Sequence, residues 1–408
     1  MRVELLPRYI FEVALLPVLT IIAVCCRWKR KEIDVGLGPE PLVNNVYHKM
    51  ALEMYGYGAE TFVSDVYFIT DKFDIRGDQL FRTEFSLMKK PLKYLASLCL
   101  FVMSLWRYRC VYMSFNGGPL GLVTAILWRI EPFLYKLGGV KIVVLPYGGD
   151  VQEMSRSPNL LFKHVYGQDY PDHRFHRRKI ASRIDLLTCY ANYIIGGCEW
   201  VDYMYHWDTL MLAHFSIDVD VWKPGVRTTD GSHDIRNEKI RVLHAPNHRA
   251  IKGTRYFTDA INELIEEGVD LELVMLEGVS NDRVKEVMAS VDVVADQLIV
   301  GWYAMFAVEA MAMEKPVLCF LREDLERLYV ASGLVAADEI PIIHCSPLTV
   351  KETIRELVLN RDKLSEIGKR SRDYVIKHHS TRAVGKVFDE LNRSIGLKSK
   401  HAKNRRQA

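Results

Sequence analysis

The sequence lacks the cysteine spacings that mark disulfide frameworks and zinc sites. Its 408 residues include eight cysteines, of which only Cys25 and Cys26 are adjacent, and no C-x-x-C is present. Buried free thiols in a reducing compartment are therefore expected. His173 and His176 are three positions apart, but no third ligand stands near them and the neighbouring arginines would repel a cation. We expect no metal ion.

The sequence also lacks internal repeats and a complete dinucleotide-binding fingerprint. Gly36-Leu37-Gly38 resembles the start of that fingerprint, but the third glycine is missing and Pro41 follows. These absences argue against a repeat architecture and against hydride transfer with a dinucleotide cofactor.

The body of the chain lacks an excess of positive charge. The net charge is +3 at pH 7, yet residues 1–31 carry six basic and two acidic residues, and the last eleven carry five basic and no acidic residues. The remaining body therefore has a net charge of −6. This distribution argues against binding of nucleic acid and favours termini that meet an anionic membrane surface.

Residues 9–26 form a mostly apolar run, interrupted by Glu12 and Pro17 and followed by the basic residues of 27–31. The run is of borderline length for crossing a bilayer. A cleaved signal peptide is not expected, because the basic residues follow the apolar run and no small-residue cleavage site is evident. Three interpretations stay open: a membrane anchor with its basic side in the cytoplasm, an interfacial helix, or an upstream extension foreign to the natural protein. The apolar length and the positive flank favour membrane association.

Alternating strand and helix patterns predict an α/β protein, and 408 residues predict two domains, because single cores rarely exceed about 250–300 residues. We place an apolar and basic N-terminal segment at 1–31, a first domain at 32–226, a polar linker at 228–238, a second domain at 239–390 and a basic tail at 391–408. The predicted strands cover residues 33–38, 59–63, 110–114, 141–145, 193–197, 240–244, 271–276, 291–295 and 317–321. The predicted helices cover residues 46–58, 91–106, 282–289, 307–312 and 361–378, and a loop is predicted at 39–45.

Residues 301–321, GWYAMFAVEAMAMEKPVLCFL, have the pattern of a turn, a helix, a break and a buried strand. Pro316 cannot continue the helix, and the apolar run after it is typical of a strand buried on both faces. The helix therefore begins at the carboxyl end of a parallel strand, where open α/β sheets bind ligands. Its N-terminus, near 303–306, offers backbone N–H groups to a phosphate. Glu309 interrupts the apolar helix as either a solvent-facing glutamate or a carboxylate that accepts hydrogen bonds from ligand hydroxyls.

The letters EAMA at 309–312 and KPV at 315–317 resemble the signature near the end of glycosyltransferase family 4, of the bacterial and archaeal surface-polysaccharide type. That family has the GT-B fold, in which two Rossmann-like domains face each other across a cleft. The resemblance implies a nucleotide-sugar as co-substrate, with neither a cofactor nor a metal ion. In the family, two glutamates eight positions apart face the nucleotide-sugar. Glu309 matches the second, Gly301 stands in place of the first, and Glu314 replaces the glycine that usually precedes Lys-Pro.

Residues 245–253, APNHRAIKG, carry a second match to the family. There the turn after the domain's first strand presents an arginine and a lysine to the donor's diphosphate, and the lysine precedes a glycine. Lys252 fits this register, and Arg249 is displaced from the usual arginine position, where Asn247 and His248 fall. Fixed cations stabilise the charge that a diphosphate gains as the glycosidic bond breaks. The resemblance assigns donor binding to Asn247, His248, Arg249, Lys252, Gly301, Tyr303, Ala304 and Glu309.

Residues 147–150, YGGD, form a glycine-supported turn after a predicted strand. Asp150 either approaches a sugar hydroxyl closely or caps the helix that follows. The family often has a histidine in this turn, and Tyr147 takes its place. We predict catalytic roles for Asp150, Lys252 and Glu309. The predicted acceptor and cleft loops contain Asn44, Asn45, Asn116, Gly117, Gly118, Gly148 and Gly149.

Together these patterns predict a retaining, metal-independent glycosyltransferase that moves a sugar from a nucleotide-sugar to a lipid-linked or polysaccharide acceptor. We expect it at the cytoplasmic face of the membrane, peripheral or anchored by its N-terminal segment, with no nucleic-acid partner. Two alternatives stay open: a nucleotide-sugar epimerase, and a protein that binds a nucleotide-sugar or a partner enzyme without turnover. Gly301 and Tyr147, which replace family residues, keep the second alternative open, because fold alone does not fix function.

Overall fold

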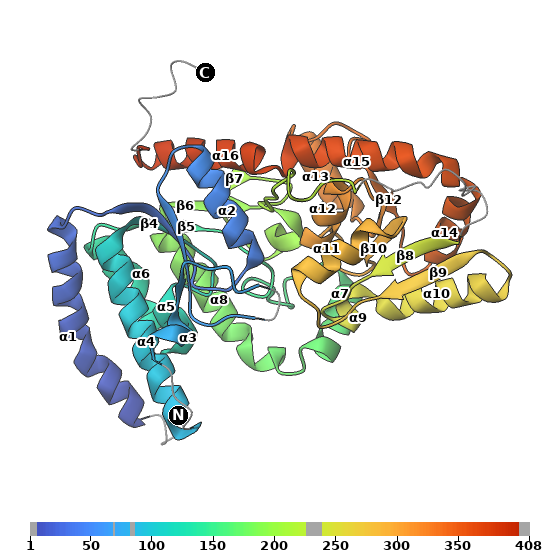
Figure 1. Cartoon of the computed structure of the whole chain (residues 1–408). Coiled ribbons are helices and arrows are strands. Elements are labelled where there is room, and N and C mark those ends of the chain that lie inside the picture. Colours follow the sequence, from blue (N-terminus) through green and yellow to red (C-terminus); the bar gives the residue numbers. More distant parts are fainter. Residues whose placement is uncertain (1–5, 68–69, 82–85, 226–238, 400–408) are drawn as a thin grey trace, which may run out of the picture.

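The computed structural model describes residues 6–67, 70–81, 86–225 and 239–399, with the backbone only for 86–89. Two parallel sheets form the centres of two α/β domains that lie side by side (Figure 1). The predicted α/β class is confirmed. The predicted linker at 228–238 and the end of the predicted basic tail, 400–408, lie outside the described residues.

The first sheet holds seven parallel strands in the order β3-β2-β1-β4-β5-β6-β7. Its central strands are buried, which explains their continuous apolar runs. Val35 of β1 pairs with Ala59 of β2 on one side and with Cys110 of β4 on the other. The strand order reverses between β1 and β4, the topological switch point of a Rossmann-type sheet. The strands are β1 (Ile33–Leu37), β2 (Ala59–Val63), β3 (Ile75–Arg76), β4 (Tyr108–Met113), β5 (Lys141–Val144), β6 (Tyr193–Gly196) and β7 (Thr209–Leu210).

The helices of the first domain cover both faces of this sheet (Figure 1). They are α1 (Leu6–Trp28), α2 (Val43–Met54), α3 (Gly77–Leu80), α4 (Ser86–Arg107), α5 (Pro119–Val123), α6 (Leu127–Leu137), α7 (Leu160–Asp169) and α8 (His173–Tyr190). The loop predicted at 39–45 is wrong at its end, because α2 begins at Val43 and includes Asn44 and Asn45 in its first turn. Pro39 and Pro41 precede this helix without interrupting it, since a proline before the first turn removes no helical hydrogen bond.

The second sheet holds five parallel strands in the order β12-β11-β10-β8-β9. The strands predicted in this domain are confirmed, and β8 has the predicted bounds. Leu243 of β8 pairs with Val294 of β10, and the strand order reverses between these two strands. The strands are β8 (Ile240–His244), β9 (Leu271–Met275), β10 (Val293–Gln297), β11 (Val317–Cys319) and β12 (Ile342–His344).

The second domain's helices are α9 (Arg249–Lys252), α10 (Thr254–Glu266), α11 (Asn281–Ala289), α12 (Met305–Ala312), α13 (Glu323–Ala331), α14 (Val350–Leu359) and α15 (Leu364–His378). The predicted turn, helix, break and strand of 301–321 are confirmed as α12 followed by β11. Glu314 closes the break with a φ of 57°. Glycine adopts this left-handed conformation without strain, which gives a physical reason for the glycine that the family usually has there.

The C-terminal helices connect the two domains. α15 lies over the second domain, and α16 (Thr381–Ser394) continues the band over the first (Figure 1). Val384, Phe388 and Leu391 of α16 are buried in the same core cluster as Val35 of β1. The chain was predicted to return to the first domain through a helix at 361–378, and α16 makes this return instead. Residues 391–394, which were placed in the basic tail, are the end of α16.

α1 packs with one face against α4 and α6. Leu19, Ala23 and Cys26 are buried on that face. The Glu12 carboxylate is also buried and accepts the N–H groups of Ala125 at 2.8 Å and Ile126 at 2.7 Å, at the start of α6. Within the described residues, α1 is the one helix long and apolar enough to cross a membrane. Its opposite face exposes Ile10, Val13, Val18 and Ile21.

Candidate functional site

Segments that follow strands of both sheets, at the end of α7 and in α9, meet at the boundary between the domains. The Tyr170 hydroxyl lies 2.7 Å from Nε2 of His248, and Oδ2 of Asp169 accepts the N–H of Ile251 at 2.8 Å. Ligands of open α/β sheets bind outside the carboxyl ends of the strands where the strand order reverses. A ligand is therefore expected at the β1–β4 or the β8–β10 switch point.

Lys252 ends α9, shortly after β8, and its Nζ lies 2.7 Å from Oδ1 of Asp296 in β10. The Asp296 side chain is fully buried, and its Oδ2 accepts the N–H of Ala304 at 2.9 Å. Asp296 thus holds the lysine beside the start of α12. The N–H groups of Met305 and Phe306 precede the first hydrogen bond within α12. A cation and a helix N-terminus at one switch point form an arrangement that binds phosphate.

Glu309 lies on α12 with 4% of its surface exposed, so the alternative of a solvent-facing glutamate is wrong. Burial raises the pKa of its carboxyl from 4.5 to about 7; the hydrogen bond from Asn281, 2.8 Å long, opposes this rise and the charge of Asp296 adds to it. Tyr47, on α2 of the first domain, lies near Glu309. Its pKa is raised to about 12, mainly by burial and to a smaller extent by the charge of Glu309. Glu309 is therefore a buried acid near residues of both domains.

The remaining residues predicted around α9 differ from Lys252 in their surroundings. Arg249 Nη2 lies 2.6 Å from Oε2 of Glu277, and 64% of the arginine side chain is exposed. The His248 ring packs against Tyr170, with 4.7 Å between ring centroids, and Asn247 is exposed. The structure therefore brings Lys252 and Glu309 together around Asp296, places Arg249 at the surface, and uses His248 to close the domain boundary.

Gly301 has a φ of 98°, and a Cβ added there would lie 2.6 Å from two carbons of the Arg322 side chain. A glutamate at this position, as in the family, does not fit unless Arg322 moves. Tyr303 is buried, and its hydroxyl lies 2.9 Å from both the Tyr374 hydroxyl and Nε2 of His379. The Tyr303 hydroxyl is therefore used in contacts with the C-terminal helices, and donor binding through the backbone near Tyr303 stays a prediction.

Asp150 is fully buried, and both of its carboxyl oxygens accept backbone N–H groups. The donors are Tyr147 at 2.9 Å, Gly148 at 3.0 Å and Phe115 at 2.9 Å. Burial raises the pKa of Asp150 to about 6, and these backbone hydrogen bonds oppose the rise. The cap alternative is wrong, because α7 begins only at Leu160 with Asn159 as its N-cap. The buried Asp150 carboxyl ties the turn after β5 to the turn after β4, and its role at a sugar stays a prediction.

The glycine turn after β4 is likewise occupied by the protein itself. Glu131 of α6 is buried, and its carboxyl oxygens accept the N–H groups of Gly118, Leu120 and Gly121 at 2.8–3.1 Å. Burial raises the pKa of Glu131 to about 8. Gly117 in this turn has a φ of 90°. The predicted cleft glycines here therefore shape the turn, and the amide of Gly118 is taken by a side chain.

The predicted cleft asparagines also bond within the first domain. Asn44 accepts the N–H of Ser216 at 2.9 Å, and Asn45 donates to the carbonyl oxygen of Glu40 at 2.9 Å. Asn116 donates to the Tyr147 hydroxyl at 2.8 Å. In the turn after β5, Gly148 is buried with a φ of 116°, whereas Gly149 is exposed.

Two acids at the switch points escaped the sequence reasoning. Asp296 holds Lys252, and Glu40 follows β1 as a buried carboxylate. A signal was present for both, because each stands at the carboxyl end of a predicted strand. A sequence pattern does not show which strands are neighbours, however, so it could not place these ends at a switch point.

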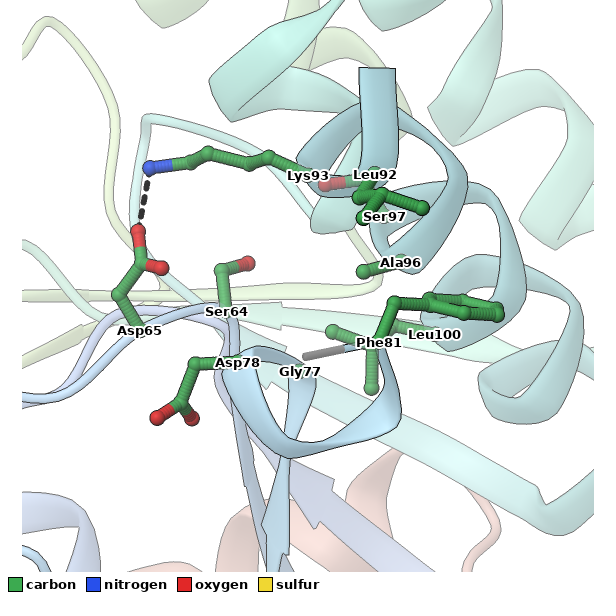
Figure 2. Close-up of a pocket in the computed structure, with 10 residues that line it drawn as sticks. All are labelled: Ser64, Asp65, Gly77, Asp78, Phe81, Leu92, Lys93, Ala96, Ser97 and Leu100. Atoms are coloured by element: carbon green, nitrogen blue, oxygen red, sulfur yellow. Dashed lines mark hydrogen bonds and ion pairs between the residues drawn. The ribbon is translucent and has the colours of Figure 1, made fainter. Parts of the chain in front are cut away.

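A cavity of about 350 Å³ lies between α3, α4 and the loop after β2 (Figure 2). Lys93 and Asp65 form an ion pair at it, and the buried hydroxyls of Ser64 and Ser97 have no hydrogen-bond partner among the described residues. Apolar and polar groups are thus combined in one cavity, as in sites for small organic ligands. Its lining residues are Ser64, Asp65, Gly77, Asp78, Phe81, Leu92, Lys93, Ala96, Ser97 and Leu100.

No family model matches this chain, and no curated protein matches it in sequence. Among solved structures it is similar to sucrose-phosphate synthase from Thermosynechococcus elongatus, with a TM-score of 0.57, 12% identity, and coverage of 89% of this chain and 99% of that one. It is also similar to Anabaena Alr3699/HepE in complex with UDP and glucose, with a TM-score of 0.54, 12% identity, and coverage of 89% of this chain and 100% of that one. For WaaG, a glycosyltransferase involved in lipopolysaccharide biosynthesis, the TM-score is 0.50 and the identity 13%, with coverage of 88% of this chain and 99% of that one. These similarities show the GT-B fold.

Proposed function

We propose that this protein is a glycosyltransferase that uses a nucleotide-sugar donor. The observation that carries the proposal is the group at the β8–β10 switch point, where Asp296 holds Lys252 beside the N-terminus of α12. A lysine and free helix N–H groups bind a diphosphate, and they stabilise the charge that grows on it as the bond to the sugar breaks. Glu309 on the same helix accepts hydrogen bonds from hydroxyl groups of the donor.

The proposal needs no metal ion, because Lys252 and the helix N-terminus supply the positive potential at the diphosphate. Arg249 adds charge at the mouth of the site, where Glu277 offsets part of it. By its resemblance to glycosyltransferase family 4, the protein transfers the sugar with retention of configuration. HepE, which shares the fold, was solved with UDP and glucose, in keeping with a nucleotide-sugar donor.

For the acceptor we propose a hydroxyl group on a lipid-linked molecule or a polysaccharide at the cytoplasmic face of a membrane. Two features of the first domain support a lipid-linked one. α1 exposes an apolar face that includes Ile10, Val13 and Ile21, as expected of a helix lying in a membrane interface. The cavity beside α4 combines apolar walls with the Lys93–Asp65 ion pair, which suits an amphiphilic molecule (Figure 2).

The test is nucleotide release from each common nucleotide-sugar, with and without a membrane lipid extract. We expect release with one donor, at a rate that rises when lipid is added. Formation of an epimer of the donor sugar without matching nucleotide release would identify an epimerase. Donor binding without release under any condition would identify a binding protein, and Gly301 would then mark the lost function.

A further inference from the structure

Four basic residues of the first domain gather where α1, α6 and α8 meet. α6 lies between the other two helices and packs against both (Figure 1). The guanidinium carbons of Arg129 and Arg183 lie 4.6 Å and 5.7 Å from the centroid of the Trp128 ring. Arg8, on α1, donates to the last carbonyl oxygen of α5, just before α6. Lys179 lies one turn before Arg183 on α8, and the proposed donor site uses none of the four.

This basic cluster contains two cations that the protein holds and two that it does not. Arg8 forms an ion pair with Glu12, with 3.2 Å between Nε and Oε1. Arg183 is buried and donates to acceptors in the segment after β4. Arg129 and Lys179 have neither a hydrogen bond nor an ion pair with another described residue. These two cations are therefore available to a ligand.

Lys179 is half-buried in surroundings of its own charge. Burial, followed by the charges of Arg183, Arg8 and Arg129, lowers the pKa of its ammonium group to about 8. A partly desolvated cation among other cations is unfavourable, and a bound anion would relieve both effects. Guanidinium and ammonium groups together are the side chains that proteins use to bind phosphate. The basic cluster is therefore suited to a phosphate group.

Each of the three helices also places an exposed phenylalanine three or four positions from its cation, and residues at these spacings share one face of a helix. The pairs are Arg8 with Phe11, Arg129 with Phe133, and Lys179 with Phe175. A free phosphate ion has no use for apolar neighbours. Aromatic rings beside cations instead suit the boundary between the headgroups and the acyl chains of a membrane. The apolar face of α1, with Ile10 and Val13, is exposed on the same helix as Arg8 and Phe11.

We propose that Arg129 and Lys179, backed by Arg8 and Arg183, bind the phosphate group of an anionic lipid. The three phenylalanines then enter the membrane interface around that headgroup. The inference goes beyond the proposed sugar transfer and does not require it. It gives the first domain a defined lipid contact, made by α6 and α8 as well as by α1.

The test is cosedimentation of the full chain with phosphatidylcholine vesicles that contain phosphatidylglycerol. Arg129→Gln with Lys179→Gln should bind these vesicles about 30-fold more weakly than wild type, since each basic residue at an anionic membrane surface contributes about fivefold in affinity. The matched control, Arg255→Gln with Lys369→Gln, removes two exposed cations of the second domain and should bind as wild type does. Thermal unfolding at pH 7 should show the cluster variant to be at least as stable as wild type, because the substitutions remove repulsion and no hydrogen bond.

Two further measurements separate a lipid from free phosphate. Inorganic phosphate, matched in ionic strength to chloride, should displace the protein from the vesicles only slightly, because it makes no apolar contacts. Phe133→Ser with Phe175→Ser keeps all four cations and should weaken vesicle binding about tenfold, because two exposed rings lose their apolar contact.

Equal weakening in the cluster variant and in its control would mean that attraction is diffuse, and it would overturn the site. Displacement by inorganic phosphate, together with no effect of the phenylalanine substitutions, would assign the basic cluster to a free phosphate and overturn the lipid. A cluster variant less stable than wild type would show that the two cations support the fold, which also contradicts the proposal. None of these results bears on the proposed glycosyltransferase, because nucleotide release without lipid does not involve the basic cluster.

Discussion

The ammonium group of Lys252 is held by Asp296 beside the N-terminus of α12, which on our proposal binds the same diphosphate. Lys252→Ala should lower turnover several hundredfold, since removing one donor that stabilises developing charge costs about 3–4 kcal/mol. Single-turnover nucleotide release measures this directly. Lys369→Ala, an exposed lysine on α15, is the control. Near-normal turnover in Lys252→Ala would contradict the assignment of the donor site.

Glu40 also predicts a pH dependence of stability that needs no substrate. Its pKa is raised from 4.5 to about 7 in the folded protein, so folding favours the protonated form. Stability from this group is therefore fully present below pH 4.5 and is lost as the pH rises through 7. Glu40→Gln stays neutral, and its free energy of unfolding should exceed that of wild type by about 3 kcal/mol at pH 8 and by little at pH 5. Urea unfolding at the two pH values measures the difference; a difference that does not change with pH would mean that folding does not raise the pKa of Glu40.

Gly301 combines a positive φ with a close neighbour, and the two effects can be separated. Gly301→Ala should destabilise the protein by about 2 kcal/mol or more, because alanine is strained at a φ of 98° and its Cβ would clash with Arg322. Gly333→Ala, at a φ of 74° with nothing within 4 Å of the added Cβ, carries the strain alone. Chemical denaturation of both variants isolates the cost of the clash, and equal destabilisation would show that Arg322 moves freely.

At single residues, the sequence predicted position better than environment. Glu309 was correctly placed on an apolar helix between two strands, but the sequence left open whether its side chain faces solvent, and the structure shows that it is buried. Asp150, Asn44 and Tyr303 were predicted less well, because their polar atoms are taken by groups that a sequence does not place nearby. The amide that occupies Asp150 Oδ2 belongs to Phe115, which is thirty-five positions away.

Elements were predicted best where apolar runs had definite ends. β8 and the segment from α12 to β11 follow from buried runs bounded by proline, glycine and charge. The helical return to the first domain was assigned to the wrong helix, because no helix was predicted at 381–394 and only packing shows which helix joins the first domain's core. α16 completes the first domain because Phe388 and Leu391 fill the core over β1.

α1 and α6 are joined through one carboxylate, which makes the docking of α1 testable. Glu12→Ala removes the acceptor for N–H groups at residues 125–127 and leaves them near an apolar helix. Each buried donor left unpaired costs about 1–3 kcal/mol, so α1 should detach before the domains unfold. Hydrogen exchange should quicken in α1 and at 125–127 and stay unchanged in β8. Unchanged exchange in α1 would show that Leu19 and its apolar neighbours hold the helix alone.

On the scale of the whole molecule, the two domains share one geometry and differ in the side chains at the point where the strand order reverses. Each sheet reverses its strand order at one point, and each reversal carries a buried acid, Glu40 in the first domain and Asp296 in the second. Asp296 is paired with a lysine, which suits a site for an anion, whereas the neighbours of the buried Glu40 carboxyl include the polar side chains of Asn116 and Ser114. This difference agrees with our proposal that the donor binds to the second domain.

The position of α1 predicts how the molecule meets a membrane. A helix that spans the bilayer would have to leave α4 and α6 and carry the Glu12 carboxylate into lipid, which is costly. A helix that stays docked can instead lay Val13, Val18 and Ile21 into the interface, with the basic segment after it near anionic headgroups. We therefore expect the full chain to sediment with vesicles containing anionic lipid and to be released by alkaline carbonate.

Replacing the exposed apolar face tests this arrangement. The double variant Val13→Glu with Ile21→Glu should fold normally and lose vesicle binding, because both side chains are more than half exposed, at 54% and 65%. The matched control is Ile265→Glu with Leu359→Glu, two exposed apolar residues of the second domain, and it should bind as wild type does. Lipid-stimulated nucleotide release should fall with binding in the first variant, while release without lipid stays the same. Wild-type protein that resists carbonate extraction would show instead that α1 leaves the domain and spans the bilayer.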